Sequence, residues 1–87
     1  MLHVQVHESA LKRGLAGAEV IRMWNEGIQE TLIDDDEPPR YVRLAFDSAG
    51  RPWELAALSF GSGARYLVIH AMPARQSVVA KMQRRLK

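Results

Sequence analysis

Two short, glycine-containing turns constrain most strongly how this chain can fold. They are Asp47-Ser-Ala-Gly50 and Gly61-Ser-Gly63, and each separates two largely apolar segments. Turns of this length join neighbouring antiparallel strands. The segments 41–46, 51–60 and 65–72 are therefore predicted to form an antiparallel meander. Because all three segments are largely apolar, we expect helices to cover at least one face of the sheet.

The first part of the chain supplies the other predicted elements. Apolar and polar residues alternate over 2–7, which predicts a short strand with His3 and His7 on its polar face. A histidine pair at this spacing could bind a metal, but no third ligand is nearby, and we expect a solvent-exposed pair. Helices are predicted over 8–13 and 18–26. The segment 28–33 fits either one more helical turn or an extended connector.

The C-terminal segment is predicted to be a helix from about Pro73 to Leu86, because proline suits a first helical turn. Its apolar side would hold Val78, Val79, Met82 and Leu86. Residues 1–87 are thus expected to form one α+β domain with the order β-α-α-β-β-β-α. Its small antiparallel sheet of three or four strands would carry two N-terminal helices and one C-terminal helix.

Charge is segregated along the sequence. Residues 26–37 hold six acidic residues and no basic one, whereas residues 65–87 hold six basic residues and no acidic one. A basic C-terminal quarter is typical of a polyanion-binding surface, although a solvated face without a ligand has the same pattern. The candidate nucleic-acid-binding residues are Lys12, Arg13, Arg65, Lys81, Arg84 and Arg85. Lys12 and Arg13 could instead complement the end of the first helix.

Composition excludes several classes of protein. The chain has no cysteine, which excludes a disulfide scaffold and a thiolate metal site and fits a reducing cytosol. No apolar run reaches the length of a membrane span, and the N-terminus lacks a signal-peptide layout. We therefore expect a cytoplasmic protein without membrane contact. The acidic run 34–37 lacks the spacing of a calcium loop and is predicted to be a solvated loop.

Each strand of the predicted meander carries one notable charged or titratable residue. If the first turn has four loop residues and the second has three, Arg43 faces Glu54 and Glu54 faces His70, in one row across the sheet. Arg75 would approach this row from the last helix. A slip of one residue in either hairpin would place the partners on opposite faces.

The predicted row suits attack of an RNA 2′-hydroxyl on its neighbouring phosphate. His70 can exchange a proton near neutral pH, and Glu54 can fix its tautomer or act as the base. Arg43 and Arg75 can hold the phosphate and stabilise the charge that develops on it. Nothing in the sequence asks for a metal or cofactor. A buried ion-pair network would use the same residue types.

Four short motifs, in the same order over nearly the whole chain, resemble the BrnT-like toxins of bacterial type II toxin–antitoxin operons, which are related to the RelE/ParE superfamily. They are Lys12-Arg13-Gly14, Glu19-Val20, the turn Asp47 to Arg51 followed by Glu54-Leu55, and His70-Ala-Met-Pro-Ala-Arg75. The last motif looks like the His-Ala-Met-x-x-Arg signature of these toxins. In the first motif, Arg13 stands where the family usually has histidine.

The resemblance implies a small α/β fold with a three- or four-stranded antiparallel sheet, RNA cleavage, and neutralisation by an antitoxin encoded beside the toxin. It also implies roles for Arg43, Glu54, His70 and Arg75. If the family's early histidine takes part in the chemistry, this chain has lost that function or moved it to His70.

The sequence leaves three functions open. The first is a toxin that acts as a metal-independent endoribonuclease on RNA, with a cognate antitoxin as partner. The alternative is a small basic module that binds a protein or a nucleic acid without catalysis. The third is an α+β domain in which the polar row is purely structural. Apolar strand faces on so small a core also suggest self-association as a homodimer.

Overall fold

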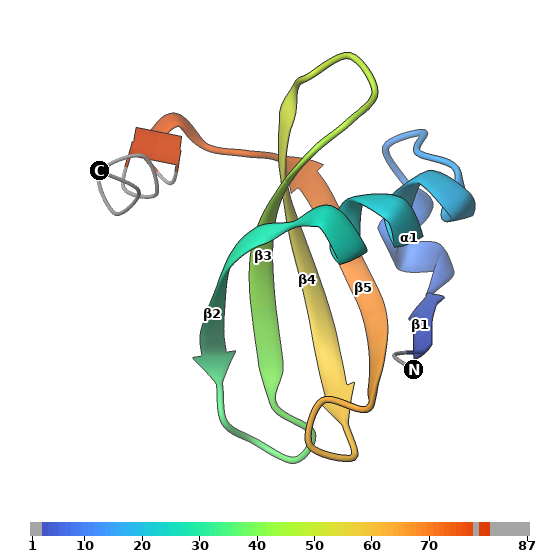
Figure 1. Cartoon of the computed structure of the whole chain (residues 1–87), viewed down its shortest axis with the longest axis vertical. Coiled ribbons are helices and arrows are strands. Elements are labelled where there is room, and N and C mark those ends of the chain that lie inside the picture. The colour runs from blue at the N-terminus through green and yellow to red at the C-terminus, as the bar shows by residue number, and fades with distance from the viewer. Residues whose placement is uncertain (1–2, 78, 81–87) are drawn as a thin grey trace.

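The computed structural model describes residues 3–77 and 79–80. Its strands are β1 (His3–Val6), β2 (Ile28–Asp34), β3 (Arg40–Phe46), β4 (Pro52–Phe60) and β5 (Arg65–Pro73). Its helices are the short 3₁₀-helix η1 (Glu8–Leu11) and the α-helix α1 (Gly17–Glu26). The strands form one sheet in the order β1-β5-β4-β3-β2, and α1 crosses in front of it (Figure 1).

The predicted meander is present, but the predicted fold class is wrong. Strands β3, β4 and β5 pair antiparallel in sequence order. The sheet has five strands rather than three or four, and it is mixed because β1 pairs parallel with β5. Helix α1 carries the chain from the β1 edge to the β2 edge across one face (Figure 1). This crossing allows the first strand to join the last one.

The helical content is also lower than predicted. The predicted first helix is a four-residue 3₁₀ turn that starts after His7, whose Nδ1 accepts a hydrogen bond from the Ser9 N–H at 3.1 Å. It gives way to a turn at Gly14, whose φ of 91° favours glycine. So short a segment does not sustain an α-helix by itself. The ambiguous segment 28–33 is part of β2, because its backbone pairs with β3.

The predicted last helix does not begin at Pro73, which is the final residue of β5 and pairs with Trp53. Proline is tolerated at a strand end, where no ladder N–H is needed. The Ala74 N–H donates to the Pro52 carbonyl at 2.9 Å and extends the contact with β4. Helical geometry begins only at Gln76. The segment 81–87 of the predicted helix lies outside the described residues.

The core lies between α1 and one face of the sheet. Val20, Met23 and Trp24 of α1 are completely buried, and Leu55 and Val68 meet them from the sheet. We call this side the covered face. The opposite side, the open face, carries the alternate residues of each strand and is not covered by η1 or α1. In the described part of the chain, no helix has the length and apolarity required to span a membrane.

Both hairpin registers differ from the prediction. Phe46 pairs with Pro52 rather than Arg51, so Arg43 faces Leu55. The cause is Asp47, because its Oδ1 accepts hydrogen bonds from the Ala49 and Arg51 N–H groups and closes a five-residue loop. This slip of one residue puts Arg43 on the covered face and Glu54 on the open face, and the predicted row is wrong.

The second hairpin departs from the prediction twice. Phe60 pairs with Arg65, which makes the loop one residue longer than expected. The register then shifts between Ala56 and Ala57, because Ile69 is an extra residue in β5. As a result His70 lies opposite Ala56, and Glu54 lies opposite Met72 rather than His70.

Candidate functional site

Arg43 belongs to a packed network on the covered face. Its guanidinium lies 4.2 Å from the ring centroid of Trp24 and 5.3 Å from that of Tyr66. It donates hydrogen bonds to the Trp24 carbonyl at 2.7 Å and to Glu30 Oε1 at 3.0 and 3.1 Å. All the polar capacity of this side chain is directed at the fold. Arg43 is therefore separated from the other predicted catalytic residues.

Glu54 and Arg75 form an ion pair on the open face. The carboxylate of Glu54 is buried, and its Oε2 accepts hydrogen bonds from the Arg75 backbone N–H at 2.9 Å and from Nε at 3.1 Å. Arg75 precedes the helical residues instead of standing on a helix. Its side chain is 65% exposed, so its guanidinium reaches solvent while its backbone is held by Glu54.

His70 lies on the same open face as Glu54, as a diagonal neighbour. Glu54 pairs with Met72 and His70 pairs with Ala56. Diagonal positions in an antiparallel pair are about 7–8 Å apart. His70 is exposed, and its side chain forms no hydrogen bond with the described residues. Its imidazole is therefore available to form a hydrogen bond with a ligand.

A hollow of about 400 Å³ brings His70 together with Lys12 and Arg13. Ser9 and Ile69 complete the same wall. Lys12 and Arg13 are exposed, so an anion can reach both cations and the imidazole from solvent. We call this group of His70, Lys12 and Arg13 the basic hollow.

The end of β1 explains why these residues meet. The parallel pairing stops at Val6 and Val68, so beyond this point β5 has no neighbouring strand on that side. The 3₁₀-helix η1 takes this place, and its Ser9 hydroxyl donates to the Ile69 carbonyl at 2.5 Å. The Ile69 bulge then turns the following residues of β5, since a bulge redirects side chains.

Arg65, another predicted binding residue, does not join the basic hollow. Arg65 is at the far end of β5, and its guanidinium lies 5.1 Å from the Phe60 ring centroid. Five residues of strand correspond to about 16 Å. Lys81, Arg84 and Arg85 lie outside the described residues. Ser9 was not predicted, because its role depends on a contact between residues 60 positions apart in sequence.

The turn between β3 and β4 borders a second hollow, of about 480 Å³, to which Arg13 also contributes. Asp47 organises this turn. A hydrogen bond from the Trp53 indole and one from the Arg51 backbone N–H lower the pKa of Asp47 to about 2. The carboxylate is thus ionised at neutral pH and is fully used by the turn.

Residues with metal-ligand chemistry are explained by local structure. The carboxylates of Asp34, Asp35 and Asp36 lie within 4.8 Å of one another. Asp34 Oδ1 accepts the Asp36 N–H at 2.9 Å, so the turn itself gathers them. His7 caps η1, and His3 lies on the exposed side of β1.

No family model matches the chain, and no match is found among the curated proteins or the solved structures. The resemblance to BrnT-like toxins thus rests on the sequence motifs alone and stays a prediction.

Proposed function

We propose that this chain is the toxin of a type II toxin–antitoxin pair and acts as a metal-independent endoribonuclease. The observation that supports the proposal is the basic hollow, in which Lys12 and Arg13 lie beside the exposed imidazole of His70. Two cations next to an imidazole that can donate or accept a hydrogen bond suit a phosphodiester. The first and last of the four motifs supply these three residues.

In the proposed reaction, neutral His70 accepts the proton of an RNA 2′-hydroxyl. The 2′-oxygen attacks the adjacent phosphorus, and the bond from phosphorus to the 5′-oxygen breaks. The 5′-oxygen takes a proton from the imidazolium or from water. The products are a 2′,3′-cyclic phosphate and a 5′-hydroxyl end. Lys12 and Arg13 stabilise the added charge on the phosphoryl oxygens.

The remaining predicted catalytic residues take different parts in this proposal. Arg75 reaches solvent on the open face and is assigned a contact with a neighbouring phosphate. Glu54 is a positioning residue, because both its oxygens accept hydrogen bonds from Arg75. Arg43 is left out of the site, since it is enclosed by Trp24, Glu30 and Tyr66.

A second candidate function is RNA binding without cleavage. It is favoured by the engagement of Glu54 with Arg75, which leaves no carboxylate beside His70 among the described residues of the basic hollow. Cleavage of this kind gains most from one group that removes a proton and another that supplies one. A single imidazole must do both.

The proposal includes a cytoplasmic location, where RNA is accessible, and a cognate antitoxin as the protein partner. Strand β2 is an edge of the sheet, and Leu32 and Ile33 on it are 49% and 57% exposed. Such an edge can accept a partner strand from an antitoxin or from a second copy of the chain. Either contact would cover these two side chains.

The experiment is controlled expression of the wild type beside His70→Asn, with His3→Asn as the matched control for an exposed strand histidine. Growth and the ends of cellular RNA are measured, and folding of each soluble variant is checked by circular dichroism. We expect growth arrest and cyclic-phosphate ends from the wild type and from His3→Asn. His70→Asn should cleave about 100-fold more slowly or worse.

Purified protein separates the two candidate functions. Lys12→Ala combined with Arg13→Ala should weaken binding to single-stranded RNA and reduce the slope of log K against log salt by about 1.4. Salt-dependent binding by abundant wild type, with no cuts at any concentration, would support the second candidate. Absence of both binding and cleavage would refute both.

A further inference from the structure

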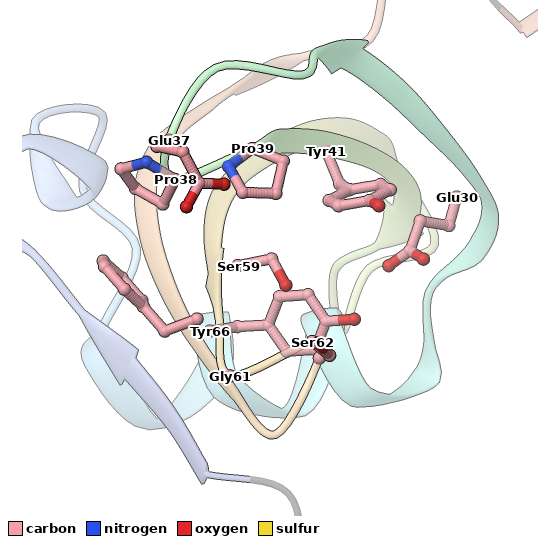
Figure 2. Close-up of a pocket in the computed structure, with 11 residues that line it drawn as sticks. Glu30, Glu37, Pro38, Pro39, Tyr41, Ser59, Gly61, Ser62 and Tyr66 are labelled. Atoms are coloured by element: carbon pink, nitrogen blue, oxygen red, sulfur yellow. The ribbon is translucent and has the colours of Figure 1, made fainter.

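A third pocket lies at the end of the sheet where the β2–β3 and β4–β5 loops meet. Its volume is about 930 Å³, and its wall includes Glu30, Glu37, Tyr41, Ser59 and Tyr66 (Figure 2). The Gly61-Ser-Gly63 turn closes one side, with positive φ angles at all three residues. Sequence reasoning did not identify this pocket, because its wall is drawn from four separate strands and two loops.

The charge of this wall is negative. Glu30 and Glu37 are its only charged side chains among the described lining residues. Glu30 Oε1 accepts hydrogen bonds from Arg43, and the Glu30 carboxylate also interacts with the neighbouring Tyr66 hydroxyl. Glu37 is exposed and has no ion pair in the described part of the chain. Figure 2 shows both carboxylates directed toward the hollow.

Two aromatic rings flank the hollow. Tyr66 is buried, and Tyr41 is half-buried on the neighbouring side. Burial and the nearby charge of Glu30 raise the pKa of Tyr66, so its hydroxyl stays neutral at physiological pH. Neutral phenol rings present negative π-faces, to which cations are attracted.

Ser59 adds a hydroxyl to the wall of the hollow. The residue is only 6% exposed, yet its hydroxyl forms no hydrogen bond with the described residues. Figure 2 shows this hydroxyl pointing into the hollow between Tyr41 and Tyr66. A hydroxyl that faces an open pocket can donate a hydrogen bond to a bound group or accept one from it.

We infer that this pocket binds a cationic nitrogen group, either an ammonium or a guanidinium. The carboxylates of Glu37 and Glu30 would supply opposite charge, Ser59 would accept an N–H, and the tyrosine rings would enclose the cation. The same negative wall disfavours a phosphate. The group could belong to a free polyamine or to a lysine or arginine side chain of a peptide. This inference is independent of the proposed RNA cleavage.

The test is an NMR titration of the isotope-labelled full chain with three probes at millimolar concentration. The probes are spermidine, N-acetyl-arginine amide and, as a neutral control, N-acetyl-glutamine amide. We expect saturable shifts in the backbone signals of residues 59–66 with at least one cation and none with the neutral probe. The tighter of the two cations identifies the source of the group.

Two single-charge variants localise the binding. Glu37→Gln should weaken cation binding by about fivefold, the effect of losing one partly exposed charge contact. Asp35→Asn removes the same charge from the same loop but does not line the pocket, so its affinity should match the wild type. Ser59→Ala should also weaken binding while leaving the remaining spectrum native.

The inference is overturned if residues 59–66 of the folded protein do not respond to either cation, or respond equally to the neutral probe. Equal weakening by Glu37→Gln and Asp35→Asn would also overturn it, because a general charge effect would then explain the binding.

Discussion

Arg43→Ala tests whether this arginine stabilises the fold, as its contacts indicate, or acts on RNA. The side chain is 17% exposed and lies between an α1 tryptophan and a β5 tyrosine. Its replacement leaves the Trp24 carbonyl and Glu30 without their main partner. We therefore expect a large loss of stability and no specific loss of chemistry per folded molecule.

The magnitude follows from the individual contacts of Arg43. The hydrogen bond to the Trp24 carbonyl, at 2.7 Å, is of a charged type that contributes about 1.5–3 kcal/mol. The pair with Glu30, whose side chain is 35% exposed, adds about 0.5–1 kcal/mol after screening by solvent. Stacking on Trp24 adds about 1 kcal/mol. The expected cost is about 3–5 kcal/mol.

Urea unfolding followed by tryptophan fluorescence measures this cost, because Trp24 reports on the affected site. At an m-value of about 1 kcal/mol/M, the midpoint should fall by about 3–5 M. Arg40→Ala is the matched control, since Arg40 is exposed on the same strand and should change stability by less than about 0.5 kcal/mol. Equal midpoints for Arg43→Ala and Arg40→Ala would refute the structural role.

Three further predictions concern stability. Asp47→Asn should remove the decrease in stability that Asp47 causes at acid pH. Because the pKa of Asp47 is lowered from 3.8 to about 2, its contribution to stability is present above pH 3.8 and is lost as the pH falls through 2. A series of urea midpoints measured at different pH values checks this. Tyr66→Phe should reduce the loss of stability at alkaline pH, because the raised pKa of Tyr66 makes the stability of the wild type fall as the pH rises above 10. Urea midpoints measured between pH 9 and 11 would show it. Gly27→Ala should lower the thermal midpoint, because the new Cβ would lie 3.1 Å from the Met23 carbonyl oxygen, whereas the open Gly17→Ala should not.

The elements of the fold that are marked by local signals were predictable. Strands β3, β4 and β5 and helix α1 lie within one or two residues of the predicted ranges. Each is bounded by a turn or glycine signal and has an apolar pattern of the expected period. Strand β2 had no such marker, because the sequence of 28–33 fits both a helix and an extended segment. Only its pairing with β3 decides between the two.

The candidate site was less predictable, because it depends on non-local contacts. The register of the first hairpin is set by side-chain hydrogen bonds of Asp47, which loop length does not reveal. The basic hollow requires β1 to lie parallel to β5 and η1 to fill the edge beyond it. His70, Lys12 and Arg13 were each predicted as functional residues, but in different groups.

The two hairpin registers determine where charge is left without a partner. They place Arg43 and Glu54 on opposite faces. Arg43 therefore pairs with Glu30, and Glu54 pairs with Arg75. Lys12 and Arg13 then have no ion pair within the described residues and leave the η1 side of β5 positive.

Glu37, which has no ion pair within the described residues, leaves the opposite end of the sheet negative. The β strands between these ends are largely apolar, so neither charge is compensated by the other. Two sites of opposite sign on one small sheet therefore favour two different ligands, an anion beside His70 and a cation between Tyr41 and Tyr66.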